Sequence, residues 1–328
     1  MIVVTGGAGF IGSCLVAALE ARGVPEIVVV DRLGSESKWR NLAKRELADL
    51  VAPERLPEIL RRHRRRIDAV VHLGAVSATT EADADLIVET NFRLTMALWE
   101  WCTRARSRLI YASSAATYGD GSAGFEDSAE PAALARLRPL NAYGWSKHLT
   151  DRRILRLVAE GAPRPAQWAA LKFFNVYGPN EYHKGGQQSV VVQVHRQIRA
   201  QGVAWLFRSE RDDVPDGGQL RDFVWVDDVV GVILWLLDHP GTSGLFNVGS
   251  GRARSFNDLA AAAFAALGQA PRIEYVEMPV QLQGRYQYFT EATLHRLRAA
   301  GCPFQPTPLE EGVRRYVQDH LEADDPYR

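Results

Sequence analysis

Short apolar runs alternate with longer amphipathic stretches through the first half of the chain. Four of these runs are rich in β-branched residues and nearly all apolar at their centres, as the buried strands of a parallel sheet are. They are Ile2–Thr5, Ile27–Val30, residues 69–73 and residues 108–112. The stretches between them are long enough for the crossover helices that parallel strands require. The alternation therefore predicts an α/β fold with a doubly wound parallel sheet.

The pattern changes after Gly178. Three segments lack a clear period: residues 179–188, 212–218 and 271–285. Helical periodicity returns at residues 226–237, 256–267 and 309–321. We expect residues 1–175 to form the sheet domain, joined by some elements from about 220–250. Residues 176–328 should form mainly a smaller α/β domain that covers it.

Composition narrows the class of protein. The 39 Lys and Arg balance the 39 Asp and Glu, which argues against a general binder of polyanions. The widely spaced Cys14, Cys102 and Cys302 form no CxxC pair, so we expect no disulfide framework and no metal site. The N-terminus has no basic region, and no apolar run approaches the roughly 20 residues of a membrane span. We therefore expect a cytoplasmic protein.

The strongest charge run is RRHRRR at residues 61–66. We interpret it as the solvated face of a helix that precedes the strand at residues 69–73. A site for nucleic acid would need aromatic or further basic partners nearby in the sequence, and none are present. We expect no nucleic-acid partner and no membrane partner.

A glycine-rich segment, GGAGFIG, follows the first predicted strand. Gly6 permits a tight turn, Gly9 lets backbone amides approach a pyrophosphate, and Gly12 lets the next helix pack closely on the strand. The N-terminus of that helix then faces the phosphates. Asp31 ends the second predicted strand, where its carboxylate can bind a ribose hydroxyl. This context predicts a dinucleotide site in a Rossmann-type domain.

The choice between NAD and NADP depends on the residues around Asp31. Asp31 alone would favour NAD, because its carboxylate repels a 2′-phosphate. Arg32 and Lys38 follow, and a cationic side chain can accommodate that phosphate. We expect NADP, with NAD as the alternative.

Candidate catalytic residues lie in two further segments. Tyr143 and Lys147 are four residues apart in AYGWSKHL, which places both on one face of a helix. A free tyrosine titrates near pH ~10, and a neighbouring ammonium lowers that pKa. Ser114, in YASSAATYG, would bind and orient the reacting oxygen. We expect Tyr143 to act as the acid/base, with Lys147 also reaching the nicotinamide ribose.

Together these motifs resemble the extended short-chain dehydrogenase/reductase family and its NAD-dependent epimerases and dehydratases. TGGAGFIG, HLGA, YASSAATYG and YGWSK carry the resemblance, and NVGSG at residues 247–251 with Leu309–Tyr316 extends it through the C-terminal half. The resemblance implies a nucleotide-sugar substrate. Dehydratases of the family carry Asp-Glu after the active-site Ser or Thr, where this chain has Ala115 and Ala116. A methyl group cannot transfer a proton, so an epimerase is favoured.

FFNVYGPNEYHKGGQQSVV and GRYQYFT resemble the branch of the family that inverts C6 of an ADP-linked heptose for the lipopolysaccharide inner core. Inversion needs proton transfer on both faces of a transient carbonyl. In that branch a loop lysine serves the second face, and its position here is Lys184. The alternative is that Lys184 is an ordinary exposed loop residue.

The same resemblance implies the remaining contacts. For the cofactor they are Phe10, Ile11, Leu73, Gly74, Ala75, Val76, Ser77, Asn91, Val176 and Lys184. For the nucleotide-sugar they are Ser114, Asn175, Gly186, Gln193, Phe207, Arg208, Ser209, Glu210, Arg221 and Tyr286. The branch has Ser and His where this chain has Gly186 and Gln193, so some substrate contacts are altered. It has Lys where this chain has Pro53, and that difference weakens the NADP prediction. It also implies a homo-oligomer, and by analogy a pentamer.

Two other functions stay open. A UDP-hexose 4-epimerase would use the same Ser114, Tyr143 and Lys147, but it does not explain Lys184 or the GRYQ segment. A non-catalytic dinucleotide sensor would need the glycine-rich segment, but it would not need Tyr143 and Lys147 four residues apart.

Overall fold

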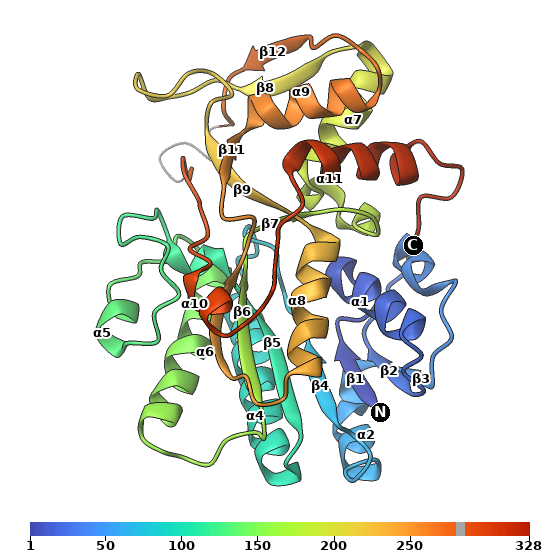
Figure 1. Cartoon of the computed structure of the whole chain (residues 1–328), viewed down its shortest axis with the longest axis vertical. Helices are drawn as coiled ribbons and strands as arrows, with labels where there is room; N and C mark the ends of the chain where they lie inside the picture. The colour runs from blue at the N-terminus through green and yellow to red at the C-terminus, as the bar shows by residue number, and fades with distance from the viewer. Residues whose placement is uncertain (280–285) are drawn as a thin grey trace.

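The computed structural model describes residues 1–279 and 286–328, and its centre is a parallel sheet of seven strands (Figure 1). The strand order is β10-β6-β5-β4-β1-β2-β3, and every neighbouring pair is parallel. The strands are β1 (Ile2–Thr5), β2 (Ile27–Val30), β3 (Asp49–Val51), β4 (Ala69–His72), β5 (Arg108–Ser114), β6 (Trp168–Phe173) and β10 (Gly244–Val248). The predicted doubly wound α/β fold is confirmed.

The four predicted strands are all present, with two shifted boundaries. The strand predicted at residues 69–73 ends at His72, and the strand predicted at residues 108–112 continues to Ser114. Strands β3, β6 and β10 were not predicted, because short or alanine-containing runs such as WAALKF carry little β-branched signal.

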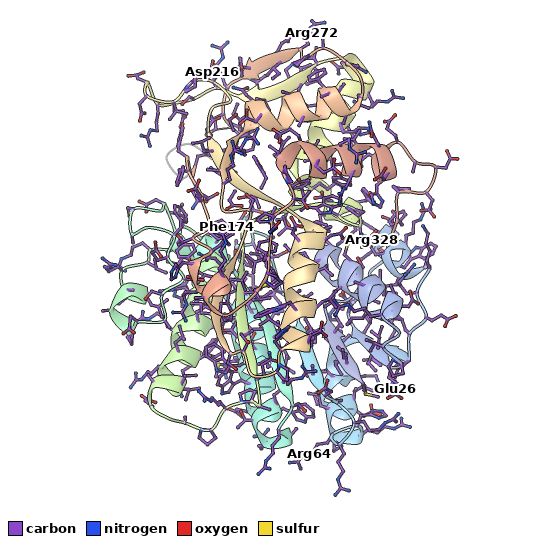
Figure 2. All side chains as sticks on the ribbon, viewed as in Figure 1. Glu26, Arg64, Phe174, Asp216, Arg272 and Arg328 are labelled. Atoms are coloured by element: carbon purple, nitrogen blue, oxygen red, sulfur yellow. The ribbon has the colours of Figure 1, made fainter. Side chains whose placement is uncertain are left out.

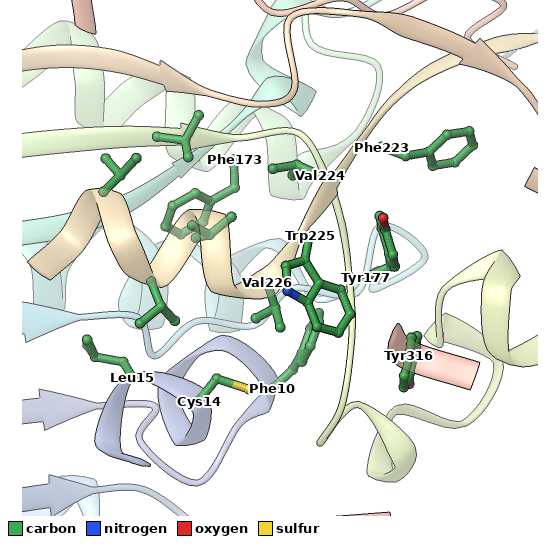
Figure 3. Packing of buried hydrophobic residues seen from close by; sticks show 14 of the residues in the cluster. Phe10, Cys14, Leu15, Phe173, Tyr177, Phe223, Val224, Trp225, Val226 and Tyr316 are labelled. Carbon is green, nitrogen blue, oxygen red and sulfur yellow. The ribbon is translucent and has the colours of Figure 1, made fainter. Parts of the chain in front are cut away.

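Alternate residues of each strand point to opposite faces of the sheet, and each face has its own core. Val4 packs with α1 (Phe10–Ala21) and α8 (Val226–Asp238). Its neighbour Val3 packs on the other face. The helices there are α2 (Leu56–Arg62), α4 (Leu94–Ala105) and α6 (Ala142–Ala159). Figure 3 shows Cys14 and Leu15 of α1 beside Val226 of α8.

The later elements gather at the top of the molecule in Figure 1, above the central sheet. They form a three-stranded sheet, β11-β9-β7, and a parallel pair, β12-β8. The strands are β7 (Asn175–Tyr177), β8 (Ala204–Phe207), β9 (Leu220–Trp225), β11 (Ala253–Ser255) and β12 (Ile273–Val276). The helices are α7 (Val190–Gln201), α9 (Phe256–Ala266) and α11 (Leu309–Tyr316).

Short helical elements complete the described chain. They are η1 (Ser37–Leu42), η2 (Pro53–Arg55), α3 (Ala84–Ile87), η3 (Val88–Arg93), η4 (Ala115–Tyr118), α5 (Pro131–Leu134), η5 (Tyr182–Gln187), α10 (His295–Ala299) and η6 (Val317–Leu321). Three elements, η5, β12 and η6, differ from what the sequence pattern predicted. The segment at residues 179–188 contains the helical turn η5, and the segment at residues 271–285 contains β12, whose half-exposed side chains gave no clear period. The helix predicted at residues 309–321 ends at Tyr316 and continues as the π-helical turn η6.

The arginine-rich run at residues 61–66 is only partly helical. Helix α2 ends at Arg62, so the rest of the run lies in the turn that leads to β4. All five arginines are exposed, and Arg64 lies at the lower end of the molecule in Figure 2. Arg66 forms an ion pair with Glu26. The prediction of a solvated helix face is therefore wrong for the second half of the run, which is a solvated turn.

No helix within residues 1–279 and 286–328 is long and apolar enough to cross a membrane. The three cysteines are free and buried. The described part of the chain contains no cluster of three or more His, Cys, Asp or Glu that could hold a metal ion.

Candidate active site

Side chains would not fit at Gly6, in the loop between β1 and α1, or at Gly12, in the first turn of α1. Gly6 has a φ of +69°, and a Cβ there would lie 2.5 Å from the backbone nitrogen of Gly74. A Cβ at Gly12 would lie 2.0 Å from the carbonyl oxygen of Gly6. Gly9 occupies the N-cap of α1 and supplies no side-chain cap, so the first amides of the helix stay available to an anion.

This loop forms one wall of a cavity of about 930 Å³ at the carboxyl ends of the central strands. The volume suits a dinucleotide with part of a second molecule. The predicted residues that line it are Gly6, Gly9, Phe10, Ile11, Gly12, Asp31, Lys38, Leu73, Gly74, Ala75, Ser77, Ser114, Tyr143, Lys147, Val176, Lys184 and Gly186. The structure thus brings the predicted catalytic and cofactor residues largely to one place.

Asp31 joins the glycine-rich loop to the residues that follow β2. Its Oδ2 accepts a hydrogen bond from the amide of Ala8 at 2.9 Å, and its Oδ1 accepts from Lys38 Nζ at 2.6 Å. Arg32 is different, because its side chain is 71 % exposed and is paired with Glu54. It does not line the cavity, so only Lys38 of the two predicted cations lies there.

Asn91 and Val76 support the cavity from behind. Asn91 is fully buried, and its side chain exchanges two hydrogen bonds, each of 2.9 Å, with the backbone of Val76. Its Nδ2 also lies 3.0 Å from Ser146 Oγ on α6. Asn91 therefore fastens the segment after β4 to the helix that carries Tyr143, and neither Asn91 nor Val76 lines the cavity.

The N-terminal turn of helix α6 packs against η4, and this contact places Tyr143 near Ser114. The Asn141 side chain caps the helix by accepting a hydrogen bond from the amide of Gly144 at 2.8 Å. A Cβ on Gly144 would lie 2.6 Å from the carbonyl oxygen of Ala116, so glycine allows the first turn to approach η4 closely. The Ser114 side chain lies close enough to Tyr143 to act on its hydroxyl.

Burial dominates the titration of this pair. It raises the pKa of Tyr143, although the hydrogen bond from Ser114 opposes the shift, and Asp151 raises the pKa further. Burial also lowers the pKa of Lys147 to about 8, and its Nζ donates to the carbonyl oxygen of Ala112 at 2.8 Å. The expectation that Lys147 lowers the pKa of Tyr143 is therefore wrong for this geometry. Burial of the phenol is the largest cause of the upward shift in the pKa of Tyr143.

Lys184 lies on the turn η5, on another wall of the same cavity. Its Nζ is 5.3 Å from the centroid of the Phe10 ring, within the range of a cation–π contact. Burial lowers the pKa of Lys184, and Glu181 opposes that shift. A positive φ of 54° at Gly185 turns the chain directly after it.

Two residues that the sequence did not single out hold this loop. Glu181 is fully buried, and its carboxylate accepts hydrogen bonds from Ser189 N, from Ser189 Oγ at 2.6 Å and from the Tyr316 hydroxyl at 3.1 Å. Asn41 Nδ2 lies 2.9 Å from the carbonyl oxygens of both Ala8 and Asn180. The loop is thereby fastened to α11 on one side and to the glycine-rich segment on the other.

A second cavity of about 660 Å³ adjoins the first at Ser114 and Tyr143. It is lined in part by Thr79, Thr80, Glu81, Asn175, Gln287 and Thr290. Ala115 and Ala116 also line it, so methyl groups occupy the positions where a dehydratase of this family carries its Asp-Glu pair. Asn175 is the predicted substrate residue that this cavity adds to Ser114.

Gly186 lines the large cavity, whereas the remaining predicted substrate residues lie elsewhere among the described residues. Gln193 is exposed on α7 and donates to the carbonyl oxygen of Gln188. Residues 207–210 follow or end β8. Arg221, on β9, is buried, and its guanidinium lies 4.9 Å from the centroid of the Tyr286 ring. None of these remaining residues lines either cavity. The predicted GRYQ segment begins with residues 284 and 285, which lie outside the described residues.

A glycine-rich loop on a doubly wound sheet, with Ser114, Tyr143 and Lys147 in one cavity, is typical of nucleotide-sugar-modifying oxidoreductases and isomerases. Residues 2–249 match the NAD dependent epimerase/dehydratase family, and the chain belongs to that family. The predicted resemblance is confirmed.

Individual relatives narrow the comparison. The chain is 52 % identical, over 100 % of both sequences, to the ADP-L-glycero-D-manno-heptose-6-epimerase of Nitratidesulfovibrio vulgaris (strain DP4). The solved structure of the ADP-L-glycero-D-manno-heptose-6-epimerase of Helicobacter pylori is similar, with a TM-score of 0.76, 28 % identity and coverage of 97 % of this chain and 95 % of that one. The UDP-glucose 4-epimerase of Thermus thermophilus, solved with NAD, has a TM-score of 0.74, 26 % identity and coverage of 98 % and 99 %.

Proposed function

We propose that this protein is an epimerase that inverts C6 of ADP-D-glycero-D-manno-heptose to give the L-glycero epimer. The reaction is an oxidation to a transient carbonyl followed by re-reduction. The observation that carries the proposal is that Tyr143 and Lys184 line one cavity from two different walls. Inversion at C6 without turning the carbonyl over uses one such group for each face, whereas a simple dehydrogenase needs only one. The 52 % identity to a heptose epimerase over the whole chain supports the same substrate.

The residues of the large cavity fit a bound dinucleotide. Gly6 and Gly12 let the backbone pack closely at the start of α1, and the first turn of that helix has no side-chain cap, so its amides can bind a pyrophosphate. When bound, the nicotinamide supplies reversible hydride transfer at C6. We infer NADP rather than NAD, because Lys38 is paired with Asp31 at the cavity and so offsets the repulsion between that carboxylate and a 2′-phosphate.

The chain's own residues then move the hydroxyl proton of C6. Ser114 orients the oxygen, and Tyr143 takes or returns its proton on one face. Lys147 holds the backbone at Ala112 and can reach the nicotinamide ribose. On the other face Lys184 performs the proton transfer, because burial lowers its pKa toward a useful range.

The substrate would extend from these groups toward the second half of the chain. The cavity at Asn175 and Ser114 suits the heptose, and Arg221 with Tyr286 suits the ADP group. In this proposal residues 1–175 hold the dinucleotide and residues 176–328 hold mainly the nucleotide-sugar. A homo-oligomer and a cytoplasmic location are proposed from the family resemblance alone.

The test is incubation of the purified protein with each ADP-heptose epimer, followed by chromatographic separation of the products. Both epimers should reach the same mixture without net consumption of added NADPH, because the hydride is recycled. UDP-galactose is the control substrate. Preferential turnover of UDP-galactose would replace the proposal with a hexose 4-epimerase, and net NADPH consumption would replace it with a reductase. Mass spectrometry of the dinucleotide released on denaturation separates NADP from NAD.

A further inference from the structure

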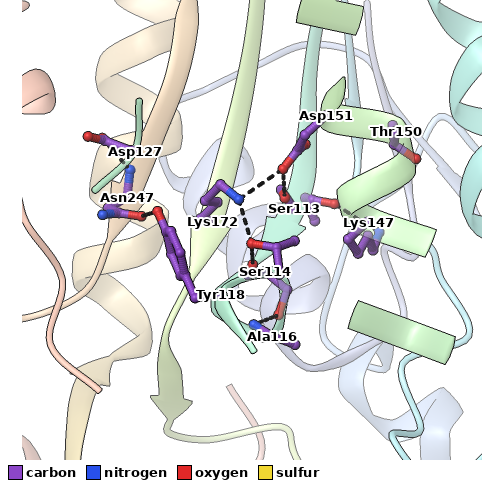
Figure 4. A network of polar contacts seen from close by, with 12 residues as sticks. Ser113, Ser114, Ala116, Tyr118, Asp127, Lys147, Thr150, Asp151, Lys172 and Asn247 are labelled. Carbon is purple, nitrogen blue, oxygen red and sulfur yellow. Dashed lines mark hydrogen bonds and ion pairs between the residues drawn. The ribbon is translucent and has the colours of Figure 1, made fainter. Parts of the chain in front are cut away.

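A fully buried ion pair lies inside the sheet domain, directly behind the candidate catalytic residues. Lys172 on β6 and Asp151 on α6 both have fully inaccessible side chains, and their charged atoms are 3.1 Å apart (Figure 4). Removing two charges from water is costly, and an apolar pair of the same size would often be at least as stable. The position of the pair therefore needs a reason other than stability.

The hydrogen bonds of the pair lead to the strand that carries Ser114. Asp151 Oδ2 accepts from Ser113 Oγ at 2.6 Å. Lys172 Nζ donates to Thr117 Oγ1, and that hydroxyl donates to the carbonyl oxygen of Ser114 at 2.8 Å. Figure 4 shows Lys172 between Asp151 and Ser114, with Lys147 on the same helix as Asp151.

Helix α6 presents Tyr143, Lys147 and Asp151 at four-residue intervals, so the three side chains lie on one face. Lys147 holds the carbonyl oxygen of Ala112, and Asp151 holds the side chain of Ser113. With Lys172 acting on Ser114 through Thr117, three successive residues of β5 are fixed from neighbouring elements. The last of them is the serine that binds Tyr143.

We propose that Asp151 and Lys172 are positioning residues of the active site, which hold Ser114 in register with Tyr143 and Lys147 and whose opposite charges balance the field at that pair. This inference rests on the proposed function for its kinetic test. Its titration test requires only the folded protein.

The field has a defined sign. Asp151 raises the pKa of both Tyr143 and Lys147. The other titratable groups that face either pair are His72, Tyr111, Tyr118, Asp127 and His148. The pKa values of the two histidines are lowered to about 3 and about 4, and those of the two tyrosines are raised well above 10. These four are therefore neutral near pH 7. Asp151 is the charged group that acts on both Tyr143 and Lys147, and it is paired with Lys172, which the partly buried Asp127 also faces.

Three variants separate charge from packing: Asp151→Asn, Lys172→Met and the double variant. Loss of the Asp151 charge should move both limbs of the pH profile of kcat/KM to lower pH, by about half a unit or more. Loss of the Lys172 charge should move both limbs to higher pH by a similar amount. The double variant should return the limbs close to the wild-type position. The kcat of the double variant should still be about 10- to 100-fold below that of the wild type, because Ser114 is less firmly held in it.

Thr150→Val is the matched control. Thr150 is a buried neighbour on α6 whose hydroxyl donates to the Ser146 carbonyl oxygen within the helix, and this change should not move the limbs. Circular dichroism and thermal unfolding check that each variant folds, and the double variant avoids the single unpaired charge that could prevent folding.

A second readout needs no substrate. The tyrosinate absorbance is measured against pH for each protein and for the same protein carrying Tyr143→Phe. The difference between the two curves is the titration of Tyr143. Its midpoint should move down in Asp151→Asn and up in Lys172→Met. If the wild type converts no ADP-heptose, the proposed function fails and this titration still decides the inference. If both single variants fold and titrate at the wild-type midpoint, the pair is only structural and the inference is overturned.

Discussion

The cavity has two chemically active walls that are built in different ways. The sheet wall, consisting of Ser114, Tyr143 and Lys147, comes from one strand and one helix of the central α/β unit. The loop wall, consisting of residues 178–189 with Lys184, is held by groups from distant parts of the chain. Glu181 bonds to Tyr316, 135 residues away, and Asn41 bonds to the carbonyl oxygen of Asn180, 139 residues away.

This difference indicates how each wall keeps its geometry. In the sheet wall the backbone positions follow from strand pairing and helix packing, and buried side chains refine them. In the loop wall a single carboxylate accepts several of the hydrogen bonds that hold the turn. Changes far from Lys184 should therefore disturb its position in the loop wall. Tyr143 in the sheet wall should respond mainly to changes in residues that contact it.

The largest effect is expected from Tyr143→Phe. The ring is kept, so dinucleotide binding should survive, while kcat for epimerisation falls by about 10²–10⁴ because one acid/base is lost. Steady-state kinetics with dinucleotide titration as the binding control measures both. A kcat near the wild-type value would remove Tyr143 from the mechanism and leave the sheet wall with a binding role.

The next effect concerns Lys184→Met, which keeps the aliphatic stem and removes the charge. Epimerisation should fall by at least about 10² in one direction or both. A 6-aldehyde analogue of ADP-mannose, which can be oxidised and reduced without inversion, should still react because Tyr143 serves it. Product chromatography compares the two substrates. Epimerisation within a few-fold of wild type would make Lys184 an ordinary loop residue and favour the 4-epimerase alternative.

Glu181→Gln tests the support of the loop wall without touching the sheet wall. The amide keeps the size of the carboxylate but weakens its bonds to Ser189 and Tyr316, so we expect a fall of about 10-fold in epimerisation. The negative charge that raises the pKa of Lys184 is also lost, so that pKa should fall further. The alkaline limb of the epimerisation profile should then move to lower pH. The aldehyde reaction should keep its profile, and equal losses in both reactions would contradict separate walls.

The sequence could predict the sheet wall almost completely. The spacing of Gly6, Gly9 and Gly12 and the four-residue interval between Tyr143 and Lys147 are local signals, and the fold brings them together by the ordinary rules of parallel sheets. The pKa values of Tyr143 and Lys147 could not be predicted from these local signals. The pKa of Tyr143 is raised because of burial, and burial depends on packing that no short motif encodes.

The loop wall and the support behind the sheet were much harder to predict. Lys184 was found through a family resemblance, and its partner Glu181 depends on Tyr316, which lies in a helix with no chemical motif of its own. Lys172 lies in an alanine-rich strand that the periodicity did not predict. A charged residue in a weakly patterned segment gives no sign of being fully buried until the strand order is known.

The smallest effect is expected from Tyr316→Phe, which removes one donor to Glu181 and leaves the ring in place. Tyr316 is fully buried beside Trp225 and Tyr182, so the ring contacts persist. Loss of one hydrogen bond to a carboxylate should reduce the free energy of unfolding by about 1.5–3 kcal/mol or less. Epimerisation should fall only about two- to three-fold, because Ser189 still donates twice to Glu181.

Since Tyr316→Phe keeps the charge of Glu181, it should not move the alkaline limb of the pH profile. It is therefore the control that separates geometry from charge in the Glu181→Gln result, and chemical denaturation with pH-dependent kinetics measures both quantities. A shift of the limb as large as in Glu181→Gln would mean that the position of the loop, rather than the carboxylate charge, sets the pKa of Lys184. The loop wall would then depend on its distant contacts even more strongly than its hydrogen bonds indicate.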